Sequence, residues 1–146
     1  MIEFNANVYL LALLVYREAG GEPDEGKVAV AYTVMTRAQH PCWWGTTPYD
    51  VITKREQYSS MTHLGDPQTV KFPSMADPVF RRCLEIADKV MLFSIPNPAL
   101  RADSYYAAWM DAKGMTPKWA DPAKFICQIG GHKFYSLGGD TESPAV

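Results

Sequence analysis

The sequence predicts a single α+β domain that is mainly helical and carries a small antiparallel sheet of two or three strands. Apolar residues recur at helical spacing in long segments of the first two-thirds of the chain, and short aromatic runs around a glycine pair follow in the last third. With 146 residues, the chain has the size of one ordinary domain. We expect a folded core over about residues 5–138, followed by a flexible C-terminal tail.

The first predicted helix begins after Asn7, a plausible N-cap, and ends at about Ala19. It is apolar almost all round, which is typical of a helix in the centre of a fold. Gly20 and Gly21 follow, and we expect a left-handed C-terminal cap there. Glu18 would therefore lie in the last turn of a buried helix.

Two further long helices are predicted over about residues 23–38 and 78–93, the second with Asp77 as its N-cap and a proline in its first turn. Between them, Thr47 and Pro48 are expected to cap a short helical turn that runs through Val51 and Ile52. Residues 57–74 show little periodicity, so we expect mostly loop there.

The C-terminal third favours short strands. Residues 105–109, 125–129 and 133–137 are rich in aromatic and β-branched side chains, and Gly130 and Gly131 separate the last two runs. This arrangement predicts a β-hairpin with a tight glycine turn.

Composition excludes several classes of partner. The formal net charge is −2, so there is no positive field to attract nucleic acid or anionic lipid. The longest apolar run, residues 8–16, is shorter than the roughly 20 residues that span a bilayer. It also lacks the basic region and cleavage site of a signal peptide, so we expect no membrane insertion and synthesis in the cytoplasm.

Three cysteines, Cys42, Cys83 and Cys127, are an odd number without short spacing. This count argues against a disulfide framework and favours buried, reduced thiols, with one optional disulfide.

Glu18 is the strongest catalytic candidate, because it follows an apolar run and precedes two glycines. Burial and the negative end of the helix dipole both disfavour the charged carboxylate and should raise its pKa. A carboxyl group that stays protonated near neutral pH can protonate a glycosidic oxygen as it leaves, and glycines nearby would let a sugar approach. The alternative is a glutamate that is solvated or paired with a cation, for which Arg17, Arg37 and Lys27 are candidates.

Glu22 lies beyond the glycine pair, so it need not share the helical face of Glu18. It is expected to complement the dipole of the next helix, or to serve as a second catalytic carboxylate if it faces Glu18.

Other catalytic classes lack their signatures. His40, His63 and His132 are scattered, so we expect no metal site. GxSxG, GxGxxG and P-loop patterns are absent from the sequence, and we expect no cofactor.

Aromatic side chains are the remaining candidates for a sugar-binding groove. Their rings can stack on the apolar faces of sugars, although most aromatic residues in a domain belong to its core. We expect Tyr58 and one of Tyr105 or Tyr106 to reach the groove. The full set is Trp43, Trp44, Tyr58, Tyr105, Tyr106, Trp109, Trp119 and Tyr135.

Four blocks in order, YREAGGEPDEGKVAVAYTVMTRA, DVITKREQYSS, SYYAAW and IGGHKFY, resemble the SleB-type cell wall hydrolase family, which comprises spore cortex-lytic enzymes and their phage relatives. The resemblance covers about residues 11–137. The sequence departs from the family pattern at Thr36, at Tyr58 and over residues 94–102.

The resemblance implies a lysozyme-like fold and a lytic transglycosylase that cleaves between N-acetylmuramic acid and N-acetylglucosamine in bacterial peptidoglycan. It places the catalytic glutamate on Glu18 and the second acid of the first block on Glu22. The remaining family positions fall on substrate-binding candidates: Gln57, Tyr58, Ser59, Tyr105 or Tyr106, and His132.

Two alternatives stay open: a hydrolytic muramidase that uses a second carboxylate, and a non-catalytic wall-binding or virion protein of the same fold. An amidase would normally need zinc ligands that this sequence lacks. We further expect a monomer that acts on the cell wall as a phage lysin or tail-associated enzyme, since no signal peptide or wall-binding domain is evident.

Overall fold

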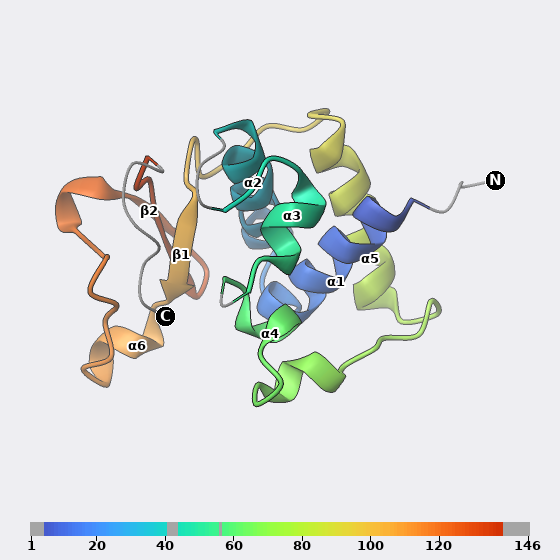
Figure 1. Ribbon diagram of the computed structural model, residues 1–146, viewed down its shortest axis with the longest axis horizontal. Helices are drawn as coiled ribbons and strands as arrows, with labels where there is room; N and C mark the ends of the chain where they lie inside the picture. Colours follow the sequence, from blue (N-terminus) through green and yellow to red (C-terminus); the bar gives the residue numbers. More distant parts are fainter. Residues whose placement is uncertain (1–4, 41–43, 56, 139–146) are drawn as a thin grey trace.

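The computed structural model describes residues 5–40, 44–55 and 57–138. The long helices gather on one side and a three-stranded sheet lies on the other (Figure 1). The long helices are α1 (Ala6–Ala19), α2 (Asp24–Gln39) and α5 (Pro78–Met91). The α+β, mainly helical prediction is confirmed.

Helix α1 begins two residues earlier than predicted. Asn5, not Asn7, is the N-cap, and its side-chain oxygen accepts hydrogen bonds from the backbone N–H groups of Asn7 (3.0 Å) and Val8 (3.3 Å). Both asparagines could cap a helix, and the extended backbone of Asn5 makes it the capping residue.

The left-handed cap predicted after α1 is wrong. Gly20 has a right-handed conformation, with φ −58°. A Cβ atom at this position would lie 2.5 Å from the carbonyl oxygen of Tyr16. Glycine is therefore required at residue 20 by a close backbone approach rather than by a positive φ.

Helices α2 and α5 form close to the predicted ranges. Asp77 caps α5 by accepting from the backbone N–H groups of Val79 (2.9 Å) and Phe80 (3.3 Å). The same carboxylate accepts a hydrogen bond from the Tyr16 hydroxyl at 3.0 Å, which ties the start of α5 to α1. The Asp77 cap and its hydrogen bond with Tyr16 thus both support the start of α5 at Pro78.

The segment between α2 and α5 contains more helix than predicted. Helix α3 (Pro48–Thr53) has the expected Thr47 cap. Within the predicted loop, α4 (Ser59–Thr62) and the 3₁₀ helix η1 (Pro67–Val70) form single turns. Such short helices produce no periodic pattern in a sequence, so tertiary contacts decide them.

The sheet consists of β1 (Ser104–Ala107), β2 (Phe125–Ile129) and β3 (His132–Tyr135), all antiparallel, in the order β1-β3-β2. The hairpin prediction is confirmed, since Gly130 and Gly131 join β2 to β3 and Gly130 has φ +54°. Trp109, which we expected in a strand, begins helix α6 (Trp109–Ala112) instead. Strand β1 ends at Ala107, and the Ala108 N–H donates to the Gly131 carbonyl (2.8 Å) beside the β2–β3 turn. A second 3₁₀ helix, η2 (Pro122–Lys124), precedes β2.

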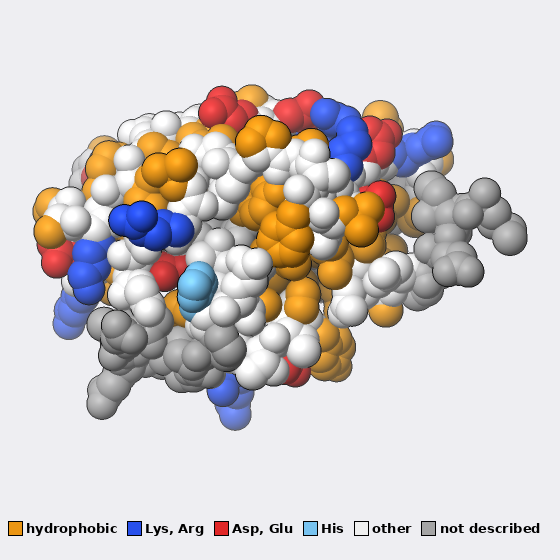
Figure 2. Space-filling view, turned by 90° about the horizontal axis from the view of Figure 1, so that it is seen from above, with side chains coloured by type: hydrophobic (Ala, Val, Ile, Leu, Met, Phe, Trp, Pro, Cys, Tyr) orange, Lys and Arg blue, Asp and Glu red, His pale blue; other side chains and the backbone are white. Residues whose placement is uncertain are grey.

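The hydrophobic core is centred on helices α1 and α2. Leu11, Leu14, Val15, Val30 and Val34 are fully buried, as expected for helices that are surrounded by other elements. On the face seen in Figure 2, hydrophobic side chains gather near the centre, and acidic and basic side chains are interspersed. In the part of the chain that the structure describes, no helix is long and apolar enough to cross a membrane.

Two of the cysteines lie in the described residues, and both are free. Cys83 is buried, and burial raises the pKa of its thiol to about 11; Cys127 is half-buried. Cys42, Trp43 and the predicted C-terminal tail beyond Gly138 lie outside the described residues.

Candidate active site

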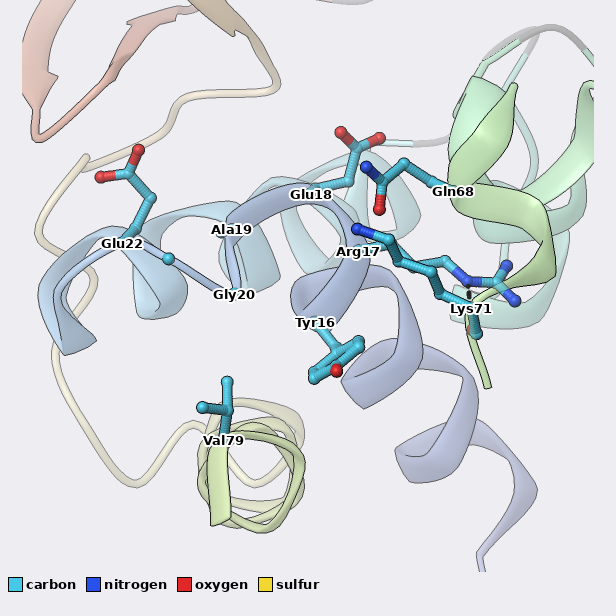
Figure 3. A pocket seen from close by; sticks show the side chains of 10 residues that line it. Tyr16, Arg17, Glu18, Ala19, Gly20, Glu22, Gln68, Lys71 and Val79 are labelled. Carbon is cyan, nitrogen blue, oxygen red and sulfur yellow. Dashed lines mark hydrogen bonds between the residues drawn. The ribbon is translucent and has the colours of Figure 1, made fainter. Parts of the chain in front are cut away.

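Glu18 lies in the last turn of α1 and is half-buried, with its carboxylate directed away from the helix axis (Figure 3). Its Oε1 atom accepts a hydrogen bond from the Ser60 hydroxyl of α4 at 3.0 Å. Burial raises the pKa of Glu18, and the negative charge of Asp66 raises it further, whereas the Ser60 hydrogen bond lowers it. The net direction is upward, as a general acid requires.

None of the three cations that could have paired with Glu18 does so. The Lys27 ammonium donates to the Glu22 carbonyl. The Arg37 guanidinium donates to the Asp103 carbonyl (2.6 Å), and it lies over the rings of Trp44 and Tyr58, at 5.3 and 5.0 Å from their centroids. No ion pair to Glu18 is formed within the described ranges.

Arg17, the immediate neighbour of Glu18, is buried and donates to backbone carbonyls. Its guanidinium reaches the carbonyl oxygens of Ser60 (2.8 Å), Thr69 (3.1 Å) and Lys71 (3.1 Å), and burial lowers its pKa. It also lies 5.0 Å from the centroid of the Phe72 ring. Arg17 thereby fixes the segment that carries Ser60 against the end of α1.

Two cavities meet at Glu18. The larger, of about 520 Å³, lies between the end of α1 and the sheet, and Glu18 is the one carboxyl group among the described residues that line it. The smaller, of about 350 Å³, extends over the junction of α1 and α2 towards η1 (Figure 3). The larger cavity is lined by Glu18, Arg37, Gln57, Tyr58, Ser59, Ser104, Tyr105, Tyr106, Ala107, Trp109, Met110, Met115, Pro117, Trp119 and His132.

Three buried polar atoms on the wall of the larger cavity have no hydrogen-bond partner among the described residues: the hydroxyls of Tyr58 and Tyr105, and Nδ1 of His132. Burial raises the pKa of both tyrosines and the charge of Glu18 adds to the increase, whereas Arg37 and, for Tyr58, the Thr33 side chain lower it. The rings of Tyr105 and His132 meet edge to face, with centroids 5.2 Å apart. Unsatisfied buried polar groups are rare in folded proteins, so this cluster is suited to hydrogen-bond a ligand beside Glu18.

Tyr106, the second tyrosine of β1, lies differently from Tyr105. Its hydroxyl donates to Asp111 (2.9 Å) and lies 3.4 Å from the hydroxyl of Tyr135, and its ring stacks on Tyr135. Burial is the main cause that raises its pKa. Tyr106 contributes to the cavity wall, while its polar atom is engaged within the protein.

Glu22 belongs to the smaller cavity, and its carboxylate is held by the hairpin. Both of its oxygens accept from the Gly131 N–H, at 3.2 and 3.1 Å, and Oε1 lies 3.7 Å from Nδ1 of His132. Cβ atoms at Gly130 and Gly131 would lie 2.2 and 2.6 Å from the two carboxylate oxygens. A side chain at either glycine would displace the Glu22 carboxylate, and the positive φ of Gly130 favours glycine in the turn.

The residues of the QYS block, 57–59, have different roles: some stabilise the local fold and others line the site. The Ser59 hydroxyl donates to Asp66 at 2.7 Å, and the next residue, Ser60, donates to Glu18. Gln57 lines the larger cavity and accepts from Arg37 at 3.4 Å. The roles of Ser60 and Asp66 were not identified from the sequence, and Arg17 was considered only as a partner for Glu18. The contacts of Ser60 and Arg17 span 40 or more positions, and those of Asp66 depend on the fold of the α4–η1 segment.

Possible metal ligands do not cluster in the described part of the chain, where no group of three His, Cys, Asp or Glu side chains could hold an ion. Beside Glu18, the larger cavity presents tyrosine side chains and the imidazole of His132.

The sequence pattern of the Cell Wall Hydrolase family matches residues 21–135. The chain belongs to the cell wall hydrolase family. The match covers most of the chain and includes every candidate substrate-binding residue, and it begins just after Glu18. The protein is accordingly a peptidoglycan-cleaving enzyme. No curated protein sequence matches the chain.

Two solved structures share the fold of this cell wall hydrolase. One is the catalytic domain of the germination-specific lytic transglycosylase SleB from Bacillus anthracis, with a TM-score of 0.65, 23% identity, and coverage of 93% of this chain and 99% of that domain. The other is the catalytic domain of the Bacillus cereus SleB protein, with a TM-score of 0.60, 25% identity, and coverage of 93% and 94%. The lysozyme-like fold and the SleB-type family are thereby confirmed.

Proposed function

We propose that this enzyme cleaves the bond between N-acetylmuramic acid and N-acetylglucosamine in peptidoglycan strands by lytic transglycosylation, with Glu18 as general acid and then general base. The similar Bacillus anthracis domain is described as a lytic transglycosylase. Such a reaction requires a single carboxyl group that can both give and accept a proton.

In the first step, protonated Glu18 transfers its proton to the bridging oxygen while the bond from that oxygen to the muramoyl anomeric carbon breaks. In the second step, the Glu18 carboxylate takes the proton of the muramoyl 6-hydroxyl, whose oxygen bonds to the same anomeric carbon. Glu18 ends protonated again and no water is consumed. The attack is intramolecular, so a held sugar conformation supplies much of the acceleration.

The observation that carries this proposal is the environment of Glu18 at the larger cavity. It has a raised pKa, no cationic partner among the described residues, and no second carboxyl group beside it on the described wall of the larger cavity. Burial and the charge of Asp66 favour the protonated acid, and Ser60 can hydrogen-bond the carboxylate once it forms. Both states of the catalytic cycle are therefore accommodated.

The unsatisfied hydroxyls of Tyr58 and Tyr105, together with His132, are proposed to bind the N-acetyl and hydroxyl groups of the sugar next to the cleaved bond. They can also stabilise the charge that develops on the ring. Gln57 lies at the same wall. Trp109 and Met115 are more than half exposed at the cavity, where they offer apolar contact to a sugar face.

Mass spectrometry of the muropeptides tests the proposal. A transglycosylase releases products with a 1,6-anhydro end, one water lighter than hydrolysis products. We expect the anhydro product from the wild type, and a loss of about 10³-fold in rate for Glu18→Gln, since general acid–base catalysis contributes roughly 10²–10⁴-fold. Products one water heavier would instead indicate a hydrolase with a second carboxylate. Wall binding without any cleavage would indicate a non-catalytic protein of the same fold.

A further inference from the structure

We propose that the smaller cavity is a carboxylate-binding subsite, in which Lys71 binds the acidic substituent of the muramoyl residue. This inference rests on the proposed function, because it assumes that a glycan strand lies across Glu18. It assigns a ligand to a cavity that the reaction at Glu18 does not itself require.

Lys71 follows η1 and lies on the wall of the smaller cavity opposite the end of α1 (Figure 3). Its carbonyl accepts from Nε of Arg17 at 3.1 Å, and the carbonyl of Thr69 accepts from Nη2 of the same arginine at 3.1 Å. A buried guanidinium that belongs to the residue before Glu18 therefore anchors the backbone from which Lys71 extends. The backbone of Lys71 therefore has a defined position relative to Glu18.

The hydrogen-bond donors on this wall differ in whether they are already bonded to other groups of the protein. The guanidinium of Arg17 serves backbone carbonyls. In the described residues, the Lys71 ammonium and the Gln68 carboxamide have neither a hydrogen bond nor an ion pair to another side chain, and both line the cavity. Lys71 is thus a cation whose donors are available to a ligand.

The acidic groups of the same wall do not prevent an anion from binding. The Glu22 carboxylate accepts from the Gly131 N–H and lies near His132. Glu18 is uncharged when it is ready to act as an acid, and its pKa is raised. A bound carboxylate nearby would favour the protonated form of Glu18 further.

The substituent of muramic acid provides the matching charge. Its lactyl group ends in a carboxyl group, which is either free or extended by a peptide with carboxylates of its own, whereas N-acetylglucosamine carries no charge. In the larger cavity the lining cation, Arg37, is engaged with the Asp103 carbonyl and with aromatic rings. The difference between the two cavities would therefore orient the strand, with its acidic substituent on the Lys71 side.

Binding to the Glu18→Gln protein tests the subsite without depending on the reaction. Soluble strand fragments would be used in four forms: with stem peptides, with the peptides removed so that the lactyl carboxylate is free, and each of these with carboxylates converted to methylamides. Kd would be measured by calorimetry with and without Lys71→Gln. Lys89→Gln, an exposed lysine on α5 with the same change of charge, is the matched control.

We expect Lys71→Gln to weaken binding of the carboxylate forms about fivefold, as for a solvent-accessible ion pair, and the effect to shrink at high salt. Lys71→Glu should weaken it further. On the methylamide forms, both variants should bind like the parent. A defect that persists after peptide removal assigns the lactyl carboxylate, and one that disappears assigns the peptide carboxylates.

Equal affinities of Lys71→Gln and Lys89→Gln for every carboxylate form would overturn the subsite. A Lys71→Gln defect that is the same for methylamide and carboxylate forms would do so as well, since it would reflect shape and not charge. Failure of the proposed function is distinguishable, because it would appear in the wild-type products as the absence of the anhydro end and not in these affinities.

Discussion

The last turn of α1 and the link to α2 each carry a glutamate, and the protein surrounds the two in opposite ways. Glu18 faces a hydroxyl donor and two cavities, and burial raises its pKa. Glu22, four positions later, accepts from the backbone of the β2–β3 turn and lies beside His132. The first carboxyl group is open to a ligand, and the second connects the helices to the sheet.

This comparison shows that the role of an acid depends on which element it meets. Glycines follow Glu18 at residues 20 and 21, and glycines also receive Glu22 at residues 130 and 131. At residue 21, a Cβ would meet nothing within 4 Å, so the cavity floor is open there; at 130 and 131, the space is filled by Glu22. Glycine thus leaves space open near Glu18, at residue 21, and allows close packing of Glu22, at residues 130 and 131.

The largest expected effect is the difference in activity between the two glutamine variants. Glu22→Gln should keep its acceptor for the Gly131 N–H and should retain activity within about tenfold, with the anhydro product unchanged, whereas Glu18→Gln loses about 10³-fold. Rates on purified wall and the masses of the products measure this. Equal losses in both variants, or products that gain a water in the wild type, would show that Glu22 is a catalytic partner.

Arg17 provides the second test, because it holds the α4–η1 segment against α1. Arg17→Met should destabilise the protein by about 3 kcal/mol, since it leaves three carbonyls without a charged donor. Below the unfolding transition, kcat should fall more than KM rises, and amide hydrogen exchange should increase over residues 59–72. Arg17→Lys, which can serve some of these carbonyls, should recover part of kcat.

A matched change on the surface is Arg82→Met, which removes exposed contacts to Asp24 and Glu85. It should leave kcat unchanged. If Arg17→Met lowered only the melting temperature and left kcat and the exchange of residues 59–72 as in the wild type, Arg17 would have no role in positioning the site.

The smallest expected effects are shifts of the pH profile. The charge of Asp66 raises the pKa of Glu18, so Asp66→Asn should move the alkaline limb of kcat/KM to lower pH. The Ser60 hydrogen bond lowers that pKa, so Ser60→Ala should move the same limb to higher pH. Shifts in the same direction, or none, would mean that the limb belongs to another group.

The sequence was sufficient for the parts of the protein that local rules decide. The three long helices, the Thr47 and Asp77 caps and the glycine hairpin follow from periodicity and capping, which act over a few residues. The same local reasoning placed Glu18 at the end of a buried helix and predicted the direction of its pKa shift. The predicted strand position of Trp109 and the predicted helix start after Asn7 were wrong, because two local solutions were available and packing selected one.

Tertiary structure alone decided which groups meet Glu18. Ser60 and Glu18 are 42 positions apart, and Arg17 reaches carbonyls 43 to 54 positions away. Local propensity carries no information about such pairs, since they form only when α4 and η1 fold onto the end of α1. The sequence by itself determined that an acid ends a buried helix; the packed chain determined its donor, the two cavities beside it and the separate role of Glu22, because these depend on contacts between distant segments.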